Sequence, residues 1–215
     1  MNSPRLISFK ICPFAQRSAL LLKEKDIAFQ QDFINPEDPP LWLSELSPTG
    51  KVPILDVEGT IIFESVVISE YIDEVYPPSI HPSDALTRAT NRAWVEYTSP
   101  LYMSLFKWML ADNKTDSNNA AETLTSQLKG LEDALNHAPY FNGDRFSMVD
   151  IAAAPLAVRL DIIETLTGHS LVKDLPKIKQ WFSTLVQRET VIASYPSDLS
   201  DILAMKMKDS GSYLL

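Results

Sequence analysis

The sequence changes character near residue 80, and this change limits the folds that the chain can adopt. Before it, short runs of strand-forming residues alternate with helical stretches, whereas every periodic stretch after it has helical spacing. A chain of 215 residues can bury either one large core or two smaller ones. Residues 77–83 contain three prolines and no periodic pattern, so we predict a linker there. The linker would join a domain over residues 1–76 to an all-helical domain over residues 84–215.

The first of these domains is predicted to contain a mixed sheet. Its expected elements are a strand, a helix, a strand, a short helix, two strands and a helix, over residues 5–11, 13–25, 28–34, 39–46, 52–57, 60–63 and 65–76. The first three predict a right-handed parallel βαβ unit. Glu58-Gly59 is a two-residue hairpin signal between the last two strands. The order therefore predicts an α/β domain of thioredoxin-like arrangement, with a four-stranded mixed sheet and helices on its faces.

The second domain is predicted to be entirely helical. The expected helices cover residues 84–111, 120–137, 147–167 and 175–188, with a weak helix after Pro196 that frays beyond Asp209. Pro100 predicts a kink or break in the first helix, and Pro155 a bend in the third. Residues 112–119 are polar and are predicted to form a loop. Ser147 and Asp150 form a capping-box variant, which we interpret as a helix start that serves folding.

Composition excludes several classes of function. The formal net charge of −9 disfavours nucleic acid as the main partner, because the chain repels phosphate backbones. The sequence contains no apolar run near the length of a transmembrane helix, and its first residues lack the features of a signal peptide. We therefore expect a cytoplasmic protein without a membrane partner. One cysteine and three scattered histidines argue against a metal site.

The candidate nucleophile is Cys12. The first predicted strand gives way to the first helix at the run Ile11-Cys12-Pro13-Phe14, and a proline favours the first helical position, which makes Cys12 the predicted N-cap. The helix dipole and unpaired N–H groups stabilise an anion there, so the thiol pKa is expected to be depressed. Ala15 replaces the second thiol of a Cys-x-x-Cys motif, so an external thiol must resolve any mixed disulfide. Alternatively, Cys12 is a small buried hydrophobic residue.

The run Lys51-Val52-Pro53 precedes the third predicted strand. Pro53 has no N–H, which suits the first position of a strand. We predict that the Val52–Pro53 bond is cis, because Val52 would then turn its backbone N–H and C=O outward beside Cys12, where an extended peptide could pair with them. A trans proline at a strand edge is the alternative, and trans is the commoner state of X–Pro bonds.

Glu64 and Ser65 stand between the fourth predicted strand and the following helix. Ser65 is the predicted N-cap, and the N–H groups at a helix start form an anion site. Glu64 offers an acceptor for an ammonium group. Together they suit the end of an α-amino acid, which carries both charges on one carbon. Plain helix capping is the alternative, and for Ser65 alone it is the favoured interpretation.

The combination resembles the glutathione transferase superfamily over nearly the whole chain. The marks of this resemblance are the runs Cys12-Pro13-Phe14, Gly50-Lys51-Val52-Pro53-Ile54-Leu55, Phe63-Glu64-Ser65, Glu70-Tyr71-Ile72, Phe141-Asn142-Gly143 and Ser147-Met148-Val149-Asp150-Ile151. Three separate motifs of the first domain in the correct order are far more specific than any one of them. Within the superfamily the chain is most similar to the omega-type branch, whose members carry a cysteine at the active position.

This resemblance implies a glutathione-dependent thiol transferase or reductase in which Cys12 forms a mixed disulfide with glutathione. Dehydroascorbate reduction and removal of glutathione from thioether adducts are related activities. The implied co-substrate is glutathione and no metal is needed; the partner molecules are a small electrophile, a disulfide or a glutathione adduct, and a homodimer is expected.

The resemblance also assigns roles to individual residues. Glu64 and Ser65 would hold the γ-glutamyl end of glutathione, Val52 with Pro53 the cysteinyl backbone, and Lys51 the glycyl carboxylate. The second substrate is expected beside Cys12, between the two domains. Its candidate lining is Phe14, Tyr97, Leu101, Leu105 and Phe106. Such apolar residues on an amphipathic helix belong to a core more often than to a pocket.

One departure and two alternatives accompany this interpretation. Glu45 and Leu46 stand where related sequences often have a further basic residue, so the glycyl contact rests on Lys51 alone. A conjugating transferase is the first alternative, but Cys12 would tend to react itself. A non-catalytic protein that binds partners is the second, although a pure binding module needs none of the four residues Cys12, Lys51, Glu64 and Ser65.

Overall fold

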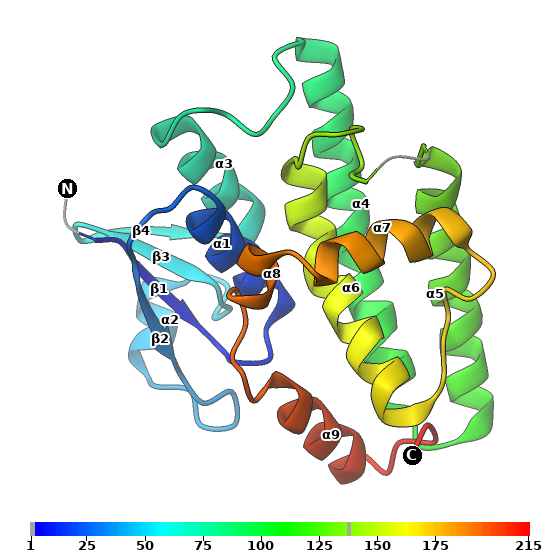
Figure 1. Ribbon diagram of the computed structural model, residues 1–215. Helices are drawn as coiled ribbons and strands as arrows, with labels where there is room; N and C mark the ends of the chain where they lie inside the picture. Colours follow the sequence, from blue (N-terminus) through cyan, green and yellow to red (C-terminus); the bar gives the residue numbers. More distant parts are fainter. Residues whose placement is uncertain (1–2, 137–138) are drawn as a thin grey trace. The chain divides into compact units, whose positions relative to one another are not determined.

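The computed structural model describes residues 3–136 and 139–215, which divide into two compact units (Figure 1). The first unit contains the chain up to Ile80 together with Glu189–Pro196, and the second contains His81–Arg188 and Ser197–Leu215. The segment Glu189–Pro196, which includes the short helix α8 (Glu189–Ile192), therefore groups with the first unit although it lies far along the sequence. Its Thr190 hydroxyl donates to the Glu24 carboxylate at 2.7 Å.

The first unit is built on the four-stranded mixed sheet that the sequence predicts. Its elements are β1 (Arg5–Ser8), α1 (Pro13–Glu24), β2 (Gln30–Phe33), α2 (Trp42–Leu46), β3 (Ile54–Val57), β4 (Thr60–Phe63) and α3 (Ser65–Val75). The strand order is β2-β1-β3-β4, with β1 parallel to β2 and the other two pairs antiparallel. At the β3–β4 hairpin Glu58 and Gly59 both have positive φ, 52° and 86°, as a tight two-residue turn requires.

Helices cover both faces of this sheet. Ile7 pairs with Ile54 across β1 and β3, and on that face they form a core with Leu43 of α2. Because side chains alternate along a strand, Leu6 and Leu55 point to the opposite face, where α1 and α3 pack against the sheet and against each other. All these side chains are buried. The segment 9–12 joins the end of β1 at Ser8 to the start of α1 at Pro13.

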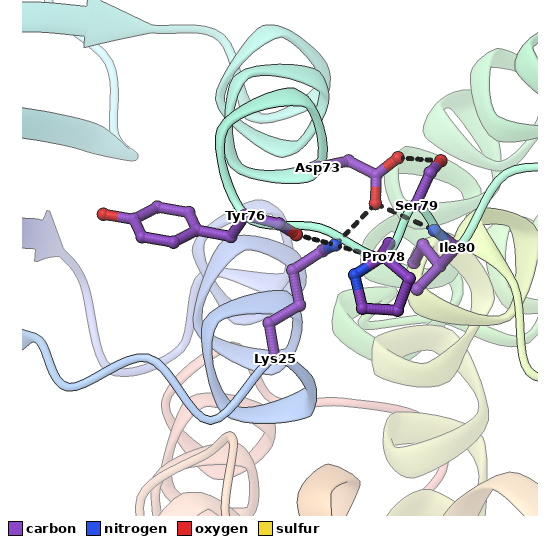
Figure 2. A network of polar contacts seen from close by, with 6 residues as sticks. All are labelled: Lys25, Asp73, Tyr76, Pro78, Ser79 and Ile80. Carbon is purple, nitrogen blue, oxygen red and sulfur yellow. Dashed lines mark hydrogen bonds and ion pairs between the residues drawn. The ribbon is translucent and has the colours of Figure 1, made fainter.

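A buried ion pair fixes the end of the first unit (Figure 2). Lys25 directly follows α1, and its ammonium lies 2.9 Å from the carboxylate of Asp73 on α3. Only 5% and 4% of the two side chains are exposed. The ammonium also donates to the carbonyl oxygens of Tyr76 and Pro78. Asp73 in turn accepts hydrogen bonds from the Ser79 hydroxyl and from the Ile80 N–H. The network therefore ties the C-terminal ends of α1 and α3 to the segment that follows α3.

The second unit is helical, as predicted. Its helices are α4 (Ala85–Leu110), α5 (Lys114–Ala134), α6 (Met148–Thr167), α7 (Pro176–Val186) and α9 (Leu199–Asp209). Helix α4 packs against α5 and α6, and α6 packs against α7. Pro100 does not break α4, which runs through it as one helix. Asp150 accepts the Ser147 N–H, as the capping-box prediction requires, and also the Phe141 N–H and the Trp181 indole N–H.

The predicted start of the second helix is wrong. Residues 114–119 belong to α5 and not to a loop, because the Asn113 side chain accepts from the Asp116 N–H and caps a helix whose first turns face solvent. Polar composition alone does not separate an exposed helix from a loop. The same helix ends at Ala134. His137, the last residue of the stretch predicted to be helical, lies outside the described residues.

The C-terminal residues do not fray after Asp209. The Ser212 hydroxyl donates to the Met109 carbonyl at 2.7 Å, and the Tyr213 N–H donates to the Ala111 carbonyl at 2.7 Å. Leu214 is buried. These contacts at the end of α4 could not be predicted from the local composition of the tail. Over the described ranges, 3–136 and 139–215, we find no helix with the length and apolar character needed to cross a membrane.

Candidate functional site

Cys12 occupies the N-cap position of α1. Its backbone is extended, with φ −70° and ψ 115°, and Pro13 opens the helix behind it. The Cys12 N–H donates to the Phe9 carbonyl, while the Cys12 carbonyl accepts the first helical hydrogen bond from Gln16. The side chain is half-buried and packs against the core formed by Ile7, Leu43, Val52 and Ile54. The predicted junction of strand and helix is therefore present, with the thiol at the positive end of the helix dipole.

The loop before β3 lies beside this thiol. The Cys12 Sγ is 3.9 Å from the carbonyl oxygen of Val52, which it approaches as a weak donor. The Val52–Pro53 bond is cis, as predicted; the Pro77–Pro78 bond in the predicted linker is also cis. The Val52 backbone therefore lies in contact with the thiol.

The start of α3 differs by one residue from the prediction. Glu64, and not Ser65, is the N-cap, and Ser65 is the first helical residue. Glu64 has a φ of 68°, a left-handed conformation that residues other than glycine seldom adopt. Its side chain is exposed, whereas Ser65 is buried. A residue other than glycine in this strained backbone conformation is typical of functional sites.

The structure brings six of the seven predicted site residues together around one cavity of about 130 Å³. The cavity is lined by Phe14, Thr49, Lys51, Val52, Pro53, Glu64 and Ser65. They come from the start of α1, the loop before β3 and the start of α3, which lie far apart in the sequence. Cys12 is not part of the lining, but it touches it through the contact with Val52.

Thr49 is the cavity residue that the sequence did not reveal. Its hydroxyl lies 3.1 Å from that of Ser47, which also accepts the Lys51 N–H at 3.3 Å. Gly50 closes this turn with a φ of 62° and an N–H that donates to the Ser47 carbonyl. The turn therefore sets the direction in which Lys51 leaves the chain. A hydroxyl residue beside a glycine turn has no distinct sequence pattern, so only the fold assigns Thr49 to the site.

The residues considered for a second substrate take different positions. Leu101 and Leu105 are completely buried, and the Tyr97 hydroxyl donates to the Gln127 carbonyl on α5, so all three serve packing within the helical unit. Phe106 is one of the residues that line a cavity of about 650 Å³ between α4 and α5. Within the described part of the chain, no group of three or more histidine, cysteine, aspartate or glutamate side chains is arranged to hold a metal ion.

Comparison with known proteins identifies the family of this chain. Residues 11–75 match the model of the glutathione S-transferase N-terminal domain, and residues 102–183 match that of the C-terminal domain. Glutathione S-transferase omega-1 of Mus musculus is 32% identical over 212 residues, which cover 96% of this chain and 87% of the relative. The chain belongs to the glutathione S-transferase family. The resemblance inferred from the sequence motifs is thereby confirmed.

Other members of the family extend the comparison. The probable glutathione S-transferase DHAR1, cytosolic, of Oryza sativa subsp. japonica is 30% identical over 84% of this chain and 82% of that protein. Among solved structures, glutathione transferase Omega 3C of Trametes versicolor has a TM-score of 0.80 at 26% identity, covering 92% and 90% of the two chains. Rice GST1 in complex with glutathione has a TM-score of 0.86 at 25% identity, covering 96% and 97%. These matches confirm the glutathione S-transferase fold predicted for both domains.

Proposed function

We propose that this glutathione S-transferase is a glutathione-dependent thiol transferase that works through Cys12. The observation that carries the proposal is the position of the Cys12 thiol at the N-terminus of α1, 3.9 Å from the Val52 carbonyl at the edge of the cavity. Similarity to omega-1 proteins and to a protein named DHAR1 supports it. The helix start stabilises a thiolate, which is the nucleophilic form.

The proposed reaction is two successive thiol–disulfide exchanges. The Cys12 thiolate attacks the glutathione sulfur of a mixed disulfide, forming the Cys12–glutathione disulfide and releasing the other sulfur as a thiolate. A second glutathione thiolate then attacks the glutathione sulfur of that disulfide, which releases glutathione disulfide and restores the Cys12 thiolate. In the net reaction the released thiol is reduced and the incoming glutathione is oxidised, since it joins the glutathione already held in the mixed disulfide. Cys12 undergoes no net change. Ala15 leaves no second thiol in α1, which is why the resolving thiol comes from outside.

The same proposal assigns glutathione to the cavity beside Cys12. Ser65 at the start of α3 and the neighbouring Glu64 carboxylate would bind the two charges of the γ-glutamyl end. The Val52 backbone, with Pro53 behind it, would pair with the cysteinyl part, and Lys51 would attract the glycyl carboxylate. Phe14 forms a wall of the cavity. A volume of about 130 Å³ accommodates one end of the tripeptide, with the remainder lying over the adjoining surface.

Partners and location are part of this proposal. The second substrate would be a disulfide, a glutathione adduct or a small electrophile. We further propose a homodimer in the cytoplasm; the name of the rice relative, which includes the word cytosolic, supports the location. Size-exclusion chromatography with light scattering tests the dimer.

The direct test of the function is intact-mass measurement after incubation with glutathione disulfide. We expect the addition of one glutathione per chain and its removal by excess glutathione, because Cys12 is the one cysteine in the sequence. Turnover of a glutathione mixed disulfide should accompany the adduct. If no adduct forms while glutathione is still bound, the nucleophile assignment is wrong and a conjugating or purely binding role replaces it.

The helix start predicts an acidic thiol. Alkylation of native Cys12 by iodoacetamide, followed as a function of pH, is expected to have a midpoint well below the value of about 8.5 for an ordinary cysteine. The same measurement on the unfolded chain in denaturant provides the reference. A native midpoint equal to or higher than this reference would contradict stabilisation of the thiolate by α1.

The cavity residues are expected to act in substrate binding. Alanine substitutions of Lys51, Glu64 and Ser65 should raise KM for glutathione by about ten-fold or more for the charged groups and less for the serine, with smaller changes in kcat. Glu74→Ala on α3 is the matched control, since Glu74 is exposed and does not line the cavity. Unchanged glutathione affinity in all three variants would remove them from the site.

A further inference from the structure

Arg17 is a buried cation directly behind the wall of the cavity. Only 2% of the residue is exposed, and it is among the largest fully buried side chains of the described chain. Its guanidinium carbon lies 5.3 Å from the centre of the Phe14 ring. The two residues are three positions apart in α1, the spacing at which side chains on a helix surface meet. This distance is that of a cation–π contact.

The contact with Arg17 bears on the cavity because the Phe14 ring is part of the cavity wall. Phe14 is half-buried and lines the cavity that is proposed to take glutathione, whereas Arg17 does not line it. One part of the ring therefore contacts the guanidinium while another forms the cavity wall. A phenylalanine in the first turn of a helix has more than one rotamer open to it, and a guanidinium held over the ring favours one of them.

Burying a guanidinium has a desolvation cost, and apolar residues of similar size often serve packing better. A buried arginine is therefore weak evidence for a role in stability. The place of Arg17 points instead to the site: it lies one turn from the cavity wall at Phe14 and five residues after Cys12 in the sequence.

We propose that Arg17 is a positioning residue for the glutathione site, acting through Phe14. Its guanidinium holds the Phe14 ring in the orientation that forms the cavity wall, so that glutathione meets a surface that is already ordered. The role in glutathione binding rests on the proposed function; the contact that orders the ring does not.

The effect on binding is tested in a double-mutant cycle. Arg17→Met keeps an unbranched apolar stem and removes the cation, and we expect KM for glutathione to rise roughly two- to thirty-fold, the range that corresponds to a cation–π contact, with kcat changed less than about two-fold. In a Phe14→Leu background, Arg17→Met should raise KM no further. Arg17→Lys should recover part of the loss, because it retains a cation but not the broad planar guanidinium.

The ring itself provides a readout that needs no glutathione. The nine phenylalanines can be labelled with 4-fluorophenylalanine, and the Phe14 signal is identified by its loss in Phe14→Leu. We expect Arg17→Met to shift or broaden this ¹⁹F signal. Lys23→Met is the matched control. Lys23 also lies on α1, and its ammonium is 5.4 Å from the centre of the Phe29 ring, so the substitution should change the Phe29 signal and leave the Phe14 signal and KM unaltered.

The outcomes separate the two proposals. An unchanged Phe14 signal in Arg17→Met overturns the positioning role, as does a rise in KM that persists in the Phe14→Leu background. An active wild-type enzyme whose KM is the same in Arg17→Met overturns it as well. A wild type that neither binds nor uses glutathione overturns the proposed function, whatever the ¹⁹F spectra show.

Discussion

Replacing Cys12 by alanine is expected to lower the rate of thiol transfer by roughly a thousand-fold or more, because the proposed reaction proceeds through a disulfide on this sulfur. The sequence has no other cysteine that could take over. The side chain is half-buried at an N-cap and makes no side-chain capping hydrogen bond, so the substitution should leave the fold intact. Turnover of a glutathione mixed disulfide, with circular dichroism and melting as controls of folding, measures the effect.

Cys12→Ser separates the chemistry from the binding. A serine oxygen cannot carry a mixed disulfide, so thiol transfer should be lost as completely as in Cys12→Ala. A hydroxyl at the same helix start can donate to a bound glutathione thiolate, and we therefore expect the serine variant to gain conjugating activity toward electrophiles. Both variants should still bind immobilised glutathione. Thiol transfer in Cys12→Ala within ten-fold of the wild type would show that another group is the nucleophile.

The largest effect on stability is expected from the buried Lys25–Asp73 pair (Figure 2). Lys25→Met leaves a buried carboxylate without its cation, and the loss of one partner of such a pair typically destabilises a protein by about 3–5 kcal/mol. The variant also leaves the Tyr76 and Pro78 carbonyl oxygens without the ammonium donor that they share. Unfolding in urea, followed by circular dichroism, should show the shift to lower denaturant concentration.

An exposed ion pair supplies the control. Lys129 and Asp133 form an i,i+4 pair on α5 with 58% and 64% of their side chains exposed, and Lys129→Met should cost less than about 1 kcal/mol. The comparison separates a buried network from an exposed pair, because both variants remove one ammonium from one carboxylate and only Lys25→Met also removes the donor of two carbonyl oxygens. Equal effects of Lys25→Met and Lys129→Met would contradict the structural role of the buried network.

The pH dependence of this network has a definite sign. Burial raises the pKa of the Asp73 carboxyl, but hydrogen bonds from Lys25, Ser79 and Ile80 outweigh it, and the pKa lies below its usual value of 3.8. A carboxyl with a lowered folded-state pKa contributes stability above the unfolded pKa and loses it as the pH falls through the folded value. Wild-type stability should therefore decline below about pH 4. In Asp73→Asn this part of the decline should be missing.

Much of the fold could be predicted because local and global signals agree. Alternating strand and helix patterns gave the mixed sheet, and Pro13 after Cys12 gave the start of α1. One prediction failed where a local signal had two physical meanings. Polar residues 114–119 suit a loop and the exposed face of a helix equally well, and only the Asn113 cap distinguishes them.

The candidate site divides in the same way. Cys12, Glu64 and Ser65 could be proposed from the sequence because each carries a chemical group at a predicted strand or helix end, and Lys51 could be proposed from the family resemblance. Thr49 and Arg17 could not, since the turn at Gly50 places Thr49 at the cavity and the first turns of α1 place Arg17 against Phe14. Asp150 shows both cases: its local cap was predicted, but its bonds to Phe141 and Trp181 were not.

By itself, the sequence determined the order of the elements and the chemical groups available to the site, because periodicity, proline positions and side-chain chemistry are local properties. The tertiary structure alone decided which groups meet. It placed Glu189–Pro196 with the N-terminal unit, buried Lys25 against Asp73 and set Arg17 behind Phe14. The physical reason is that burial and pairing over long sequence separations depend on how the helices and sheet pack, and no local pattern encodes those distances.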